Sequence, residues 1–184
     1  MPIETIVLDL DETLIHSETN PDMMTNPDFI FKIDGIKYFV RKRPGLDLFL
    51  LYIIKSFKII GIWTAATKDY AEKIVNNIFT KDQRKKLKFF MTRKHCLKNK
   101  KPLQRIFDSD NNSYECTKYN CIMIDDNPYV LENNPGNAIQ IPQFNGQSND
   151  DYLFKLCLLL QSILDMKVNI NPDNKIIILK DITD

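Results

Sequence analysis

Short, continuous apolar runs alternate along this chain with longer stretches in which apolar residues recur at helical spacing. The short runs are typical of buried strands, and we expect strands over residues 6–8, 58–63, 120–124 and 138–141. The periodic stretches predict helices, and Pro102 is typical of the first turn of a further short helix. These helices are expected over residues 46–57, 69–79, 150–166 and, after Pro102, 103–107. Because strands and helices alternate, the pattern predicts an α/β fold with a parallel sheet covered by helices.

A β-hairpin is predicted shortly after the first strand. Two apolar runs, residues 29–33 and 36–40, flank Asp34 and Gly35, and Asp-Gly between such runs is a strong hairpin signal. We expect this hairpin to form a flap or part of the sheet edge. Elsewhere, polar composition predicts loops over residues 18–28 and 108–118. The apolar run over residues 176–179 is expected to dock as a strand or an extended segment.

Three of the predicted strands end in polar signatures. Asp9 and Asp11 follow the first strand, Thr64 follows the second, and Asp125 and Asp126 follow the third. Parallel strands place their carboxyl ends side by side, where ligands of open α/β sheets bind, so we expect these residues to share one site. Carboxylates this close repel one another, and Mg²⁺, which prefers oxygen ligands, is the usual reason to keep them together. Each signature also has a purely structural interpretation. Asp9 and Asp11 could be a hydrated strand end, Thr64 could cap the next helix, and the third pair could form a turn.

Composition narrows the class of protein. Of the 184 residues, 43% are hydrophobic and 27% are charged, so we expect one soluble globular domain over residues 1–184. A net charge of +1 creates no field that would attract nucleic acid or a membrane surface, and neither partner is expected. We recognise no signal peptide or membrane span, and the four cysteines lack metal-ligand spacing. An intracellular protein of the nucleus or cytoplasm is therefore expected.

The first strand and its polar end read Ile-Val-Leu-Asp-Leu-Asp-Glu-Thr-Leu-Ile-His-Ser, which resembles motif I of the haloacid-dehalogenase-type (HAD-type) phosphotransferases. The string is similar to the FCP/SCP-like branch, which contains phosphatases of the RNA polymerase II C-terminal domain and NLI-interacting-factor-like proteins. Thr64 matches motif II, and the two aspartates after the third strand match motif IV. The candidates for the motif III lysine are Lys98, Lys100 and Lys101. The similarity of Lys-Lys-Pro-Leu to the family's Val-Lys-Asp-Leu selects Lys101, with Lys100 as the alternative.

This resemblance, over residues 3–144, implies a Rossmann-like, doubly wound HAD-like sheet. It also implies that the hairpin forms a flap and that roughly residues 79–100 form a short insert that helps to bind substrate. The substrate implied by the family is a serine or threonine phosphoprotein or phosphopeptide, with the RNA polymerase II tail as the leading example.

The resemblance further implies a chemistry. Asp9 is expected to be the nucleophile of an Mg²⁺-dependent phosphatase that forms an aspartyl-phosphate, and Asp11 the general acid and base. Thr64 and Lys101 are expected to bind phosphoryl oxygens. The implied Mg²⁺ ligands are the Asp9 carboxylate, the backbone carbonyl of Asp11, and Asp125. The neighbouring residue 126 is expected to orient that shell or the lysine.

Four further residues are candidates for substrate binding, namely Thr13, Arg43, Tyr70 and Arg93. The alternative for the two arginines is a solvated basic surface, and for the tyrosine it is a position facing the core. His16 is expected to be a hydrogen-bonded structural residue rather than a catalytic one.

Two positions depart from the polymerase-directed branch. Thr19 and Thr67 stand where that branch has an aromatic residue and a leucine lining a pocket for a substrate proline, so we expect a more polar pocket. Two alternative functions stay open. One is a HAD-type phosphatase of a small phosphate ester, and the other is a non-catalytic peptide-binding module, against which the presence of both Asp9 and Asp11 argues.

Overall fold

A computed structural model of the chain describes residues 3–108, 115–165 and 177–178. Its main feature is a six-stranded parallel sheet with the strand order β6-β5-β1-β7-β8-β9. The strands are β1 (Thr5–Leu8), β5 (Ile59–Trp63), β6 (Leu87–Met91), β7 (Cys121–Asp125), β8 (Ala138–Gln140) and β9 (Ile177–Ile178). The helices are α1 (Leu46–Ser56), α2 (Lys68–Ile78), α3 (Lys81–Arg84), α4 (Gln104–Phe107), α5 (Tyr129–Asn133) and α6 (Tyr152–Asp165). Two 3-10 turns, η1 (Pro21–Met23) and η2 (Arg93–His95), complete the described helical elements.

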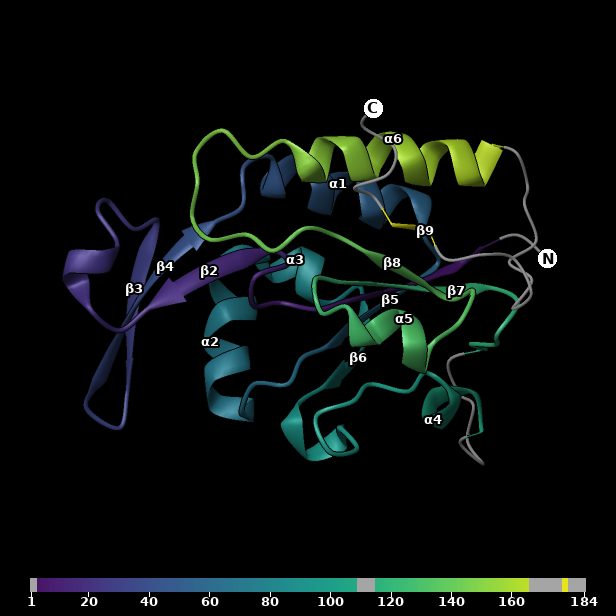
Figure 1. Cartoon of the computed structure of the whole chain (residues 1–184), viewed down its shortest axis with the longest axis horizontal. Helices are drawn as coiled ribbons and strands as arrows, with labels where there is room; N and C mark the ends of the chain where they lie inside the picture. The colour runs from purple at the N-terminus through teal and green to yellow at the C-terminus, as the bar shows by residue number, and fades with distance from the viewer. Residues whose placement is uncertain (1–2, 109–114, 166–176, 179–184) are drawn as a thin grey trace.

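Helices cover both faces of the main sheet. The side chains of Ile6 and Leu8 in β1 join a core cluster with buried residues of α1, α2 and α6. Val7, which points to the opposite face, joins a second cluster with buried residues of α4 and α5. In Figure 1, α1 and α6 lie above the sheet, and α4 and α5 lie below it. The predicted doubly wound α/β fold is therefore confirmed.

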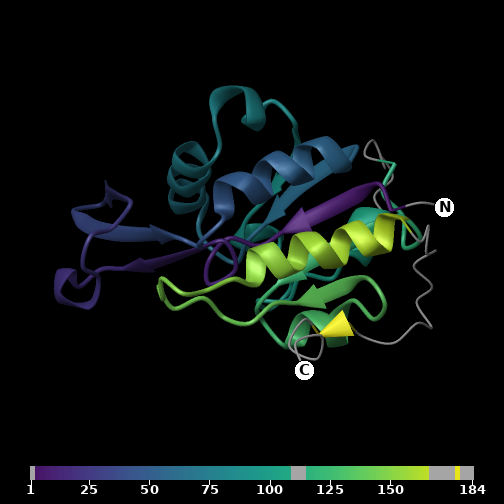
Figure 2. The same cartoon turned by 90° about the horizontal axis from the view of Figure 1, so that it is seen from above.

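The predicted hairpin is also confirmed, but it belongs to a larger unit. β3 (Phe29–Ile33) and β4 (Ile36–Lys42) pair antiparallel, and Asp34 and Gly35 between them have φ values of 47° and 84°. Both residues are thus left-handed, as the tight turns of β-hairpins require. β2 (Ile15–Glu18), which we did not predict, pairs with the other edge of β4. The resulting three-stranded flap projects to one side of the main sheet (Figures 1 and 2).

Residues 79–100 differ from the expected insert. They hold α3, η2 and β6, and β6 pairs with β5 at one edge of the main sheet. A Cβ added to Gly61 would lie 2.0 Å from the ring of Phe89, so only glycine in β5 lets this ring pack so close to the sheet. The segment therefore completes the sheet as well as reaching toward its carboxyl edge. We missed β6 because its five residues lie inside the lysine-rich run over residues 81–101, whose charge hid the short apolar strand.

Parts of three predicted elements lie outside the described residues. They are residues 109–114 of the second loop, residue 166 of the last helix, and residues 176 and 179 of the final apolar segment. No helix in the part of the chain that the structure describes is long and apolar enough to cross a membrane.

Candidate active site

The site lies at the carboxyl ends of the three central strands. β1 pairs in parallel with both β5 and β7, and Leu8 at its end stands opposite Ile62 and Ile124. Asp9 follows β1, Thr64 follows β5, and Asp125 closes β7. The three side chains consequently line one cleft of about 540 Å³. The convergence expected from the strand order is present in the fold.

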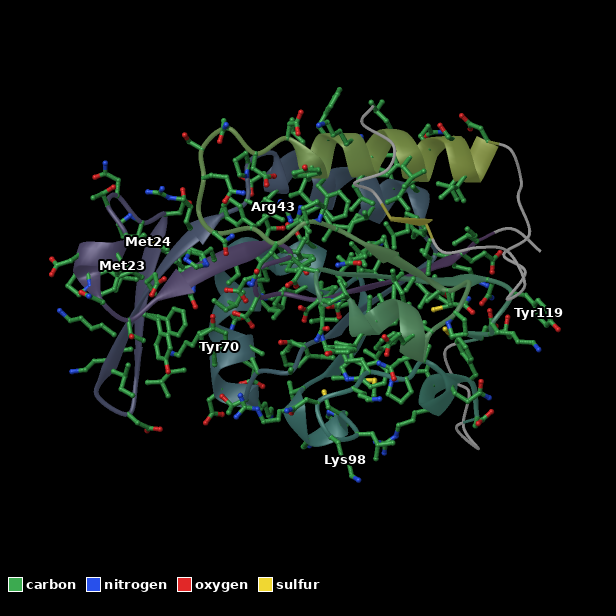
Figure 3. All side chains as sticks on the ribbon, in the orientation of Figure 1. Met23, Met24, Arg43, Tyr70, Lys98 and Tyr119 are labelled. Atoms are coloured by element: carbon green, nitrogen blue, oxygen red, sulfur yellow. The ribbon has the colours of Figure 1, made fainter. Side chains whose placement is uncertain are left out.

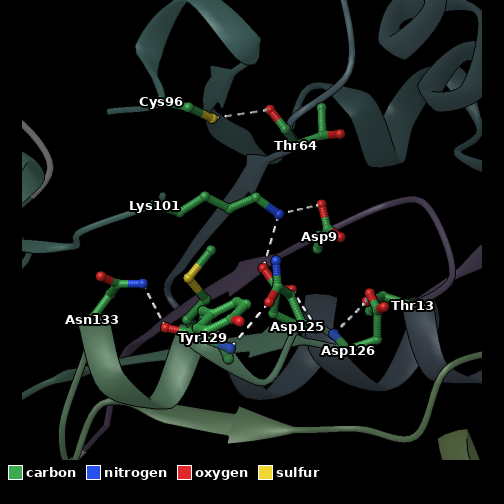
Figure 4. Close-up of polar contacts among 12 residues, drawn as sticks. Asp9, Thr13, Thr64, Cys96, Lys101, Asp125, Asp126, Tyr129 and Asn133 are labelled. Atoms are coloured by element: carbon green, nitrogen blue, oxygen red, sulfur yellow. Dashed lines mark hydrogen bonds and ion pairs between the residues drawn. The ribbon is translucent and has the colours of Figure 1, made fainter. Parts of the chain in front are cut away.

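Lys101 reaches into this cleft from the segment before α4. Its Nζ lies 2.6 Å from Asp9 Oδ1 and 2.8 Å from Asp125 Oδ2 (Figure 4). Burial disfavours the ammonium, but attraction by the two carboxylates outweighs it and raises the pKa of Lys101. Lys100 is exposed and makes no ion pair with any described residue, so the geometry favours Lys101 over it.

Three carboxylates crowd this lysine. Asp9, Asp125 and Asp126, which we call the acidic trio, offer oxygens that all lie within 4.8 Å of one another. Burial raises the pKa of Asp9 well above its usual range; Lys101 opposes this shift, whereas the neighbouring carboxylates add to it. Burial also raises the pKa of Asp126. The sequence predicts an orienting role for residue 126, but its carboxylate lies close enough to the other two to be a metal ligand itself.

Asp11 is held from the side by Tyr70 of α2. The phenol donates a hydrogen bond of 2.5 Å to Asp11 Oδ1 and lies 2.7 Å from the hydroxyl of Ser17, which then donates to the phenol. Burial raises the pKa of the Asp11 carboxyl, and the hydrogen bonds from Tyr70 and Thr64 partly oppose this. Tyr70 is only 9% exposed. It lines the cleft, but its most direct contact is with the predicted acid and base, a role that the sequence did not suggest.

Thr13 is not placed to bind substrate, which corrects our expectation. Its side chain is fully buried. The hydroxyl donates to Asp126 Oδ1 at 2.8 Å and accepts a hydrogen bond of 3.0 Å from the backbone N–H of Asp126. Thr13 therefore ties the loop after β1 to the loop after β7, because both partners of its hydroxyl belong to that second loop.

Arg43 is likewise corrected. Its guanidinium is buried and forms a bidentate pair with Asp150, with both N···O distances at 2.8 Å. It also donates to the carbonyls of Thr13 and Pro142, at 3.0 and 2.8 Å. All three guanidinium nitrogens of Arg43 donate to groups inside the protein. Arg43 therefore joins the start of α1 to the start of α6 and does not line the cleft.

Arg93 is exposed and lines the cleft, and its Nε donates to the carbonyl of Ala65 at 2.7 Å. His16 lies between two carboxylates, with ring nitrogens 3.3 Å from Glu12 and 3.2 Å from Glu18, as expected for a structural histidine. We did not expect Tyr38 at the site. Its ring lines the cleft, stacks on Phe31 and meets the Tyr70 ring edge-on. Its only signal was an aromatic residue in the predicted hairpin.

Comparisons with known proteins identify the family of the chain and support its fold. The chain is 30% identical over 169 residues to "Probable C-terminal domain small phosphatase" of Dictyostelium discoideum, which covers 90% of this chain and 52% of that relative. It is 27% identical over 172 residues to "CTD nuclear envelope phosphatase 1B" of Danio rerio, covering 86% of this chain and 66% of the relative. The chain thus spans about half to two thirds of these relatives' length.

Two solved structures share the fold. The first is that of Fcp1, an essential RNA polymerase II CTD phosphatase, with a TM-score of 0.69 at 19% identity; the match covers 89% of this chain and 63% of that chain. The second is a 3-deoxy-D-manno-octulosonate 8-phosphate phosphatase from Moraxella catarrhalis, solved with a magnesium ion and phosphate. Its TM-score is 0.55 at 13% identity, over 89% of this chain and 88% of the other. The family model described as NLI interacting factor-like phosphatase matches residues 4–170, and with these strand-end residues in place the chain belongs to that family.

Proposed function

We propose that this chain is an Mg²⁺-dependent phosphoprotein phosphatase that acts on phosphoserine or phosphothreonine through an aspartyl-phosphate on Asp9. The observation that carries the proposal is the arrangement of the acidic trio around Lys101, with Asp11 held beside it by Tyr70. A buried nucleophile, an acid and base, a phosphate-binding cation and a metal-ligating group are the parts that phosphoryl transfer needs.

The residues present fit a divalent cation with oxygen ligands. The acidic trio carries three carboxylates against the single ammonium of Lys101. Two unit charges 4.8 Å apart repel by about 3.5 kcal/mol at an effective dielectric constant of 20, so the ionised trio needs further positive charge. Asp9 and Asp125, with the trio's third member, would hold Mg²⁺. When bound, Mg²⁺ supplies charge screening and Lewis-acid polarisation of the phosphate.

The chain's own residues then account for two displacement steps. In the first, a carboxylate oxygen of Asp9 attacks phosphorus, the bond to the serine or threonine oxygen breaks, and Asp11 gives its proton to that oxygen. In the second, Asp11 takes a proton from water, the water oxygen attacks phosphorus, and the bond to Asp9 breaks to release inorganic phosphate. Lys101 and Thr64 bind the phosphoryl oxygens, where negative charge is concentrated.

The shape of the cleft supports a protein rather than a small ester as substrate. The cleft is open, and one wall is formed by Tyr38 of the flap and Tyr70 of α2. A peptide chain can lie along such a wall with a phosphorylated side chain inserted. Thr67 also lines the cleft, in line with the more polar pocket expected from the sequence. The solved structure named as an RNA polymerase II CTD phosphatase shares the fold and makes that tail the first peptide to test. A location in the nucleus or cytoplasm belongs to the same proposal.

The deciding experiment compares phosphoserine peptides from the polymerase tail with a panel of small phosphate esters, each with Mg²⁺ and with a chelator. We expect Mg²⁺-dependent turnover of the peptides, and Asp9→Asn to abolish it while far-ultraviolet circular dichroism stays unchanged. Asp82→Asn, which removes an exposed carboxylate in α3, is the matched control and should keep full activity. Activity confined to small esters would refute the protein substrate, and full activity of Asp9→Asn would refute the nucleophile.

A further inference from the structure

A second cavity of about 390 Å³ adjoins the cleft, and its volume is within the range of ligand sites. The cavity and the cleft share four lining residues, namely Asn99, Lys101, Asp125 and Asn127. A substrate bound at the acidic trio can therefore extend into this cavity without crossing the body of the protein. None of the catalytic roles proposed above uses its remaining walls.

The charge of those walls is not balanced within the described chain. Lys98 and Lys100 line the cavity together with Glu132, whereas the charge of Lys101 is already satisfied by Asp9 and Asp125. Lys98 and Lys100 are both exposed, and neither has a carboxylate within 4.0 Å among the described residues. Two lysines against one glutamate give the cavity an excess of positive charge, which favours an anion.

The two lysines are presented by a tight turn. Leu97 and Lys100 exchange backbone hydrogen bonds of 2.9 and 3.0 Å, and the two residues between them are left-handed, with φ values of 50° for Lys98 and 64° for Asn99. Left-handed backbone is costly for lysine, so its presence where the turn borders a cavity is a functional lead. Lys98 lies at the outer rim, with its side chain extending toward solvent (Figure 3).

One aromatic side chain also lines the cavity. Tyr129, at the start of α5, is 59% exposed although it is a large side chain, and it lines the cavity together with Asp125 and Lys101, all labelled in Figure 4. Its carbonyl accepts a hydrogen bond of 2.5 Å from the Asn133 side chain, which also lines the cavity. Tyr129 supplies an apolar surface for the carbon atoms of a ligand and a hydroxyl for its polar end.

We propose that this cavity is a subsite for a second anionic group on the same substrate, bound by Lys98 and Lys100 while the scissile phosphate occupies the acidic trio. The proposal rests on the proposed phosphopeptide function and narrows it to peptides that carry a second phosphate or a carboxylate side chain near the phosphorylated residue. The anion can come from either source, and a phosphate with its higher charge should bind better than a carboxylate.

The test compares kcat/KM for three kinds of peptide, carrying one phosphoserine alone, a second phosphoserine at neighbouring positions, or glutamate at those positions. The wild-type protein should prefer the best doubly phosphorylated peptide over the singly phosphorylated one by about tenfold, with glutamate in between. The double variant Lys98→Gln with Lys100→Gln should lose that preference and keep its rate on the single phosphoserine. The matched control, Lys81→Gln with Lys86→Gln, removes two exposed lysines outside both cavities and should retain the preference.

A variant expected to raise the preference instead of lowering it separates the charge effect from a general loss of folding. Glu132→Gln removes the opposing charge from the same cavity, so it should increase the preference for the doubly phosphorylated peptide by about threefold. Turnover of single phosphoserine peptides with no gain from a second anion at any position would overturn the subsite and leave the proposed function standing. The subsite would also be overturned if the control pair of substitutions, at Lys81 and Lys86, reduced the preference for the doubly phosphorylated peptide as much as the pair at Lys98 and Lys100. Failure to hydrolyse any peptide would instead refute the proposed function.

Discussion

The buried pair between Arg43 and Asp150 is expected to stabilise the fold rather than to bind substrate. Arg43→Met would leave the Asp150 carboxylate buried and without its bidentate partner, since both side chains are 0% exposed. Removing one member of a buried ion pair costs about 3–5 kcal/mol. The carbonyls of Thr13 and Pro142 lose their donor as well. At about 2–4 °C per kcal/mol for a chain of this size, the melting temperature should fall by about 6–20 °C.

Lys42→Met provides the matched control one residue away. Lys42 pairs with Asp47 on the surface, where the side chains are 27% and 74% exposed, and such pairs contribute about 0–1 kcal/mol. The double variant Arg43→Met with Asp150→Asn should be less destabilised than the sum of its single variants, because it leaves no unpaired buried charge. That non-additivity is a direct measure of the coupling between the two side chains.

Urea unfolding followed by the fluorescence of the single tryptophan, Trp63, measures these differences, since this residue is fully buried in the core. Kinetics at a temperature where Arg43→Met remains folded should give a KM for phosphopeptide close to that of the wild type. A variant with unchanged stability and a KM raised tenfold would refute this reasoning and return Arg43 to the substrate-binding residues.

Three further predictions follow from other contacts. Tyr70→Phe removes the donor to Asp11 and should lower kcat by about 10- to 100-fold with little loss of stability, while Tyr38→Phe should keep normal kcat; equal kinetics for the two variants would contradict the positioning role. Gly61→Ala would drive a methyl group into the Phe89 ring and should lower the free energy of unfolding in urea by about 1–3 kcal/mol. If adding Phe89→Leu to the Gly61→Ala chain restored none of that stability, the clash would not be the cause. Mg²⁺ at about a hundred times its dissociation constant should add about 2.7 kcal/mol, a rise of about 5–10 °C in melting temperature by calorimetry, whereas sodium at equal ionic strength should not. An unchanged melting temperature would argue against a cation at the acidic trio.

Several contacts were beyond reach of the sequence because they join residues that no local pattern connects. Arg43 follows a basic run and reads as a surface residue, yet Asp150 lies 107 positions away in sequence and neutralises it in the core. Thr13 sits inside a catalytic motif, and only the fold shows that its hydroxyl is used by the loop after β7. The strand character of residues 87–91 was hidden because these residues lie inside the lysine-rich run over residues 81–101.

The sequence by itself determined the alternation of strands and helices, the Asp-Gly hairpin, and the order in which Asp9, Thr64 and Asp125 leave their strands. Periodicity and turn chemistry are local properties, and parallel pairing converts that order into proximity. The sequence favoured Lys101 over Lys100, but only the tertiary structure decided that its ammonium meets two carboxylates, that Tyr70 holds Asp11, and that a second cavity adjoins the cleft. Side-chain direction and burial depend on packing between distant segments, and these energies arise only when the chain is folded.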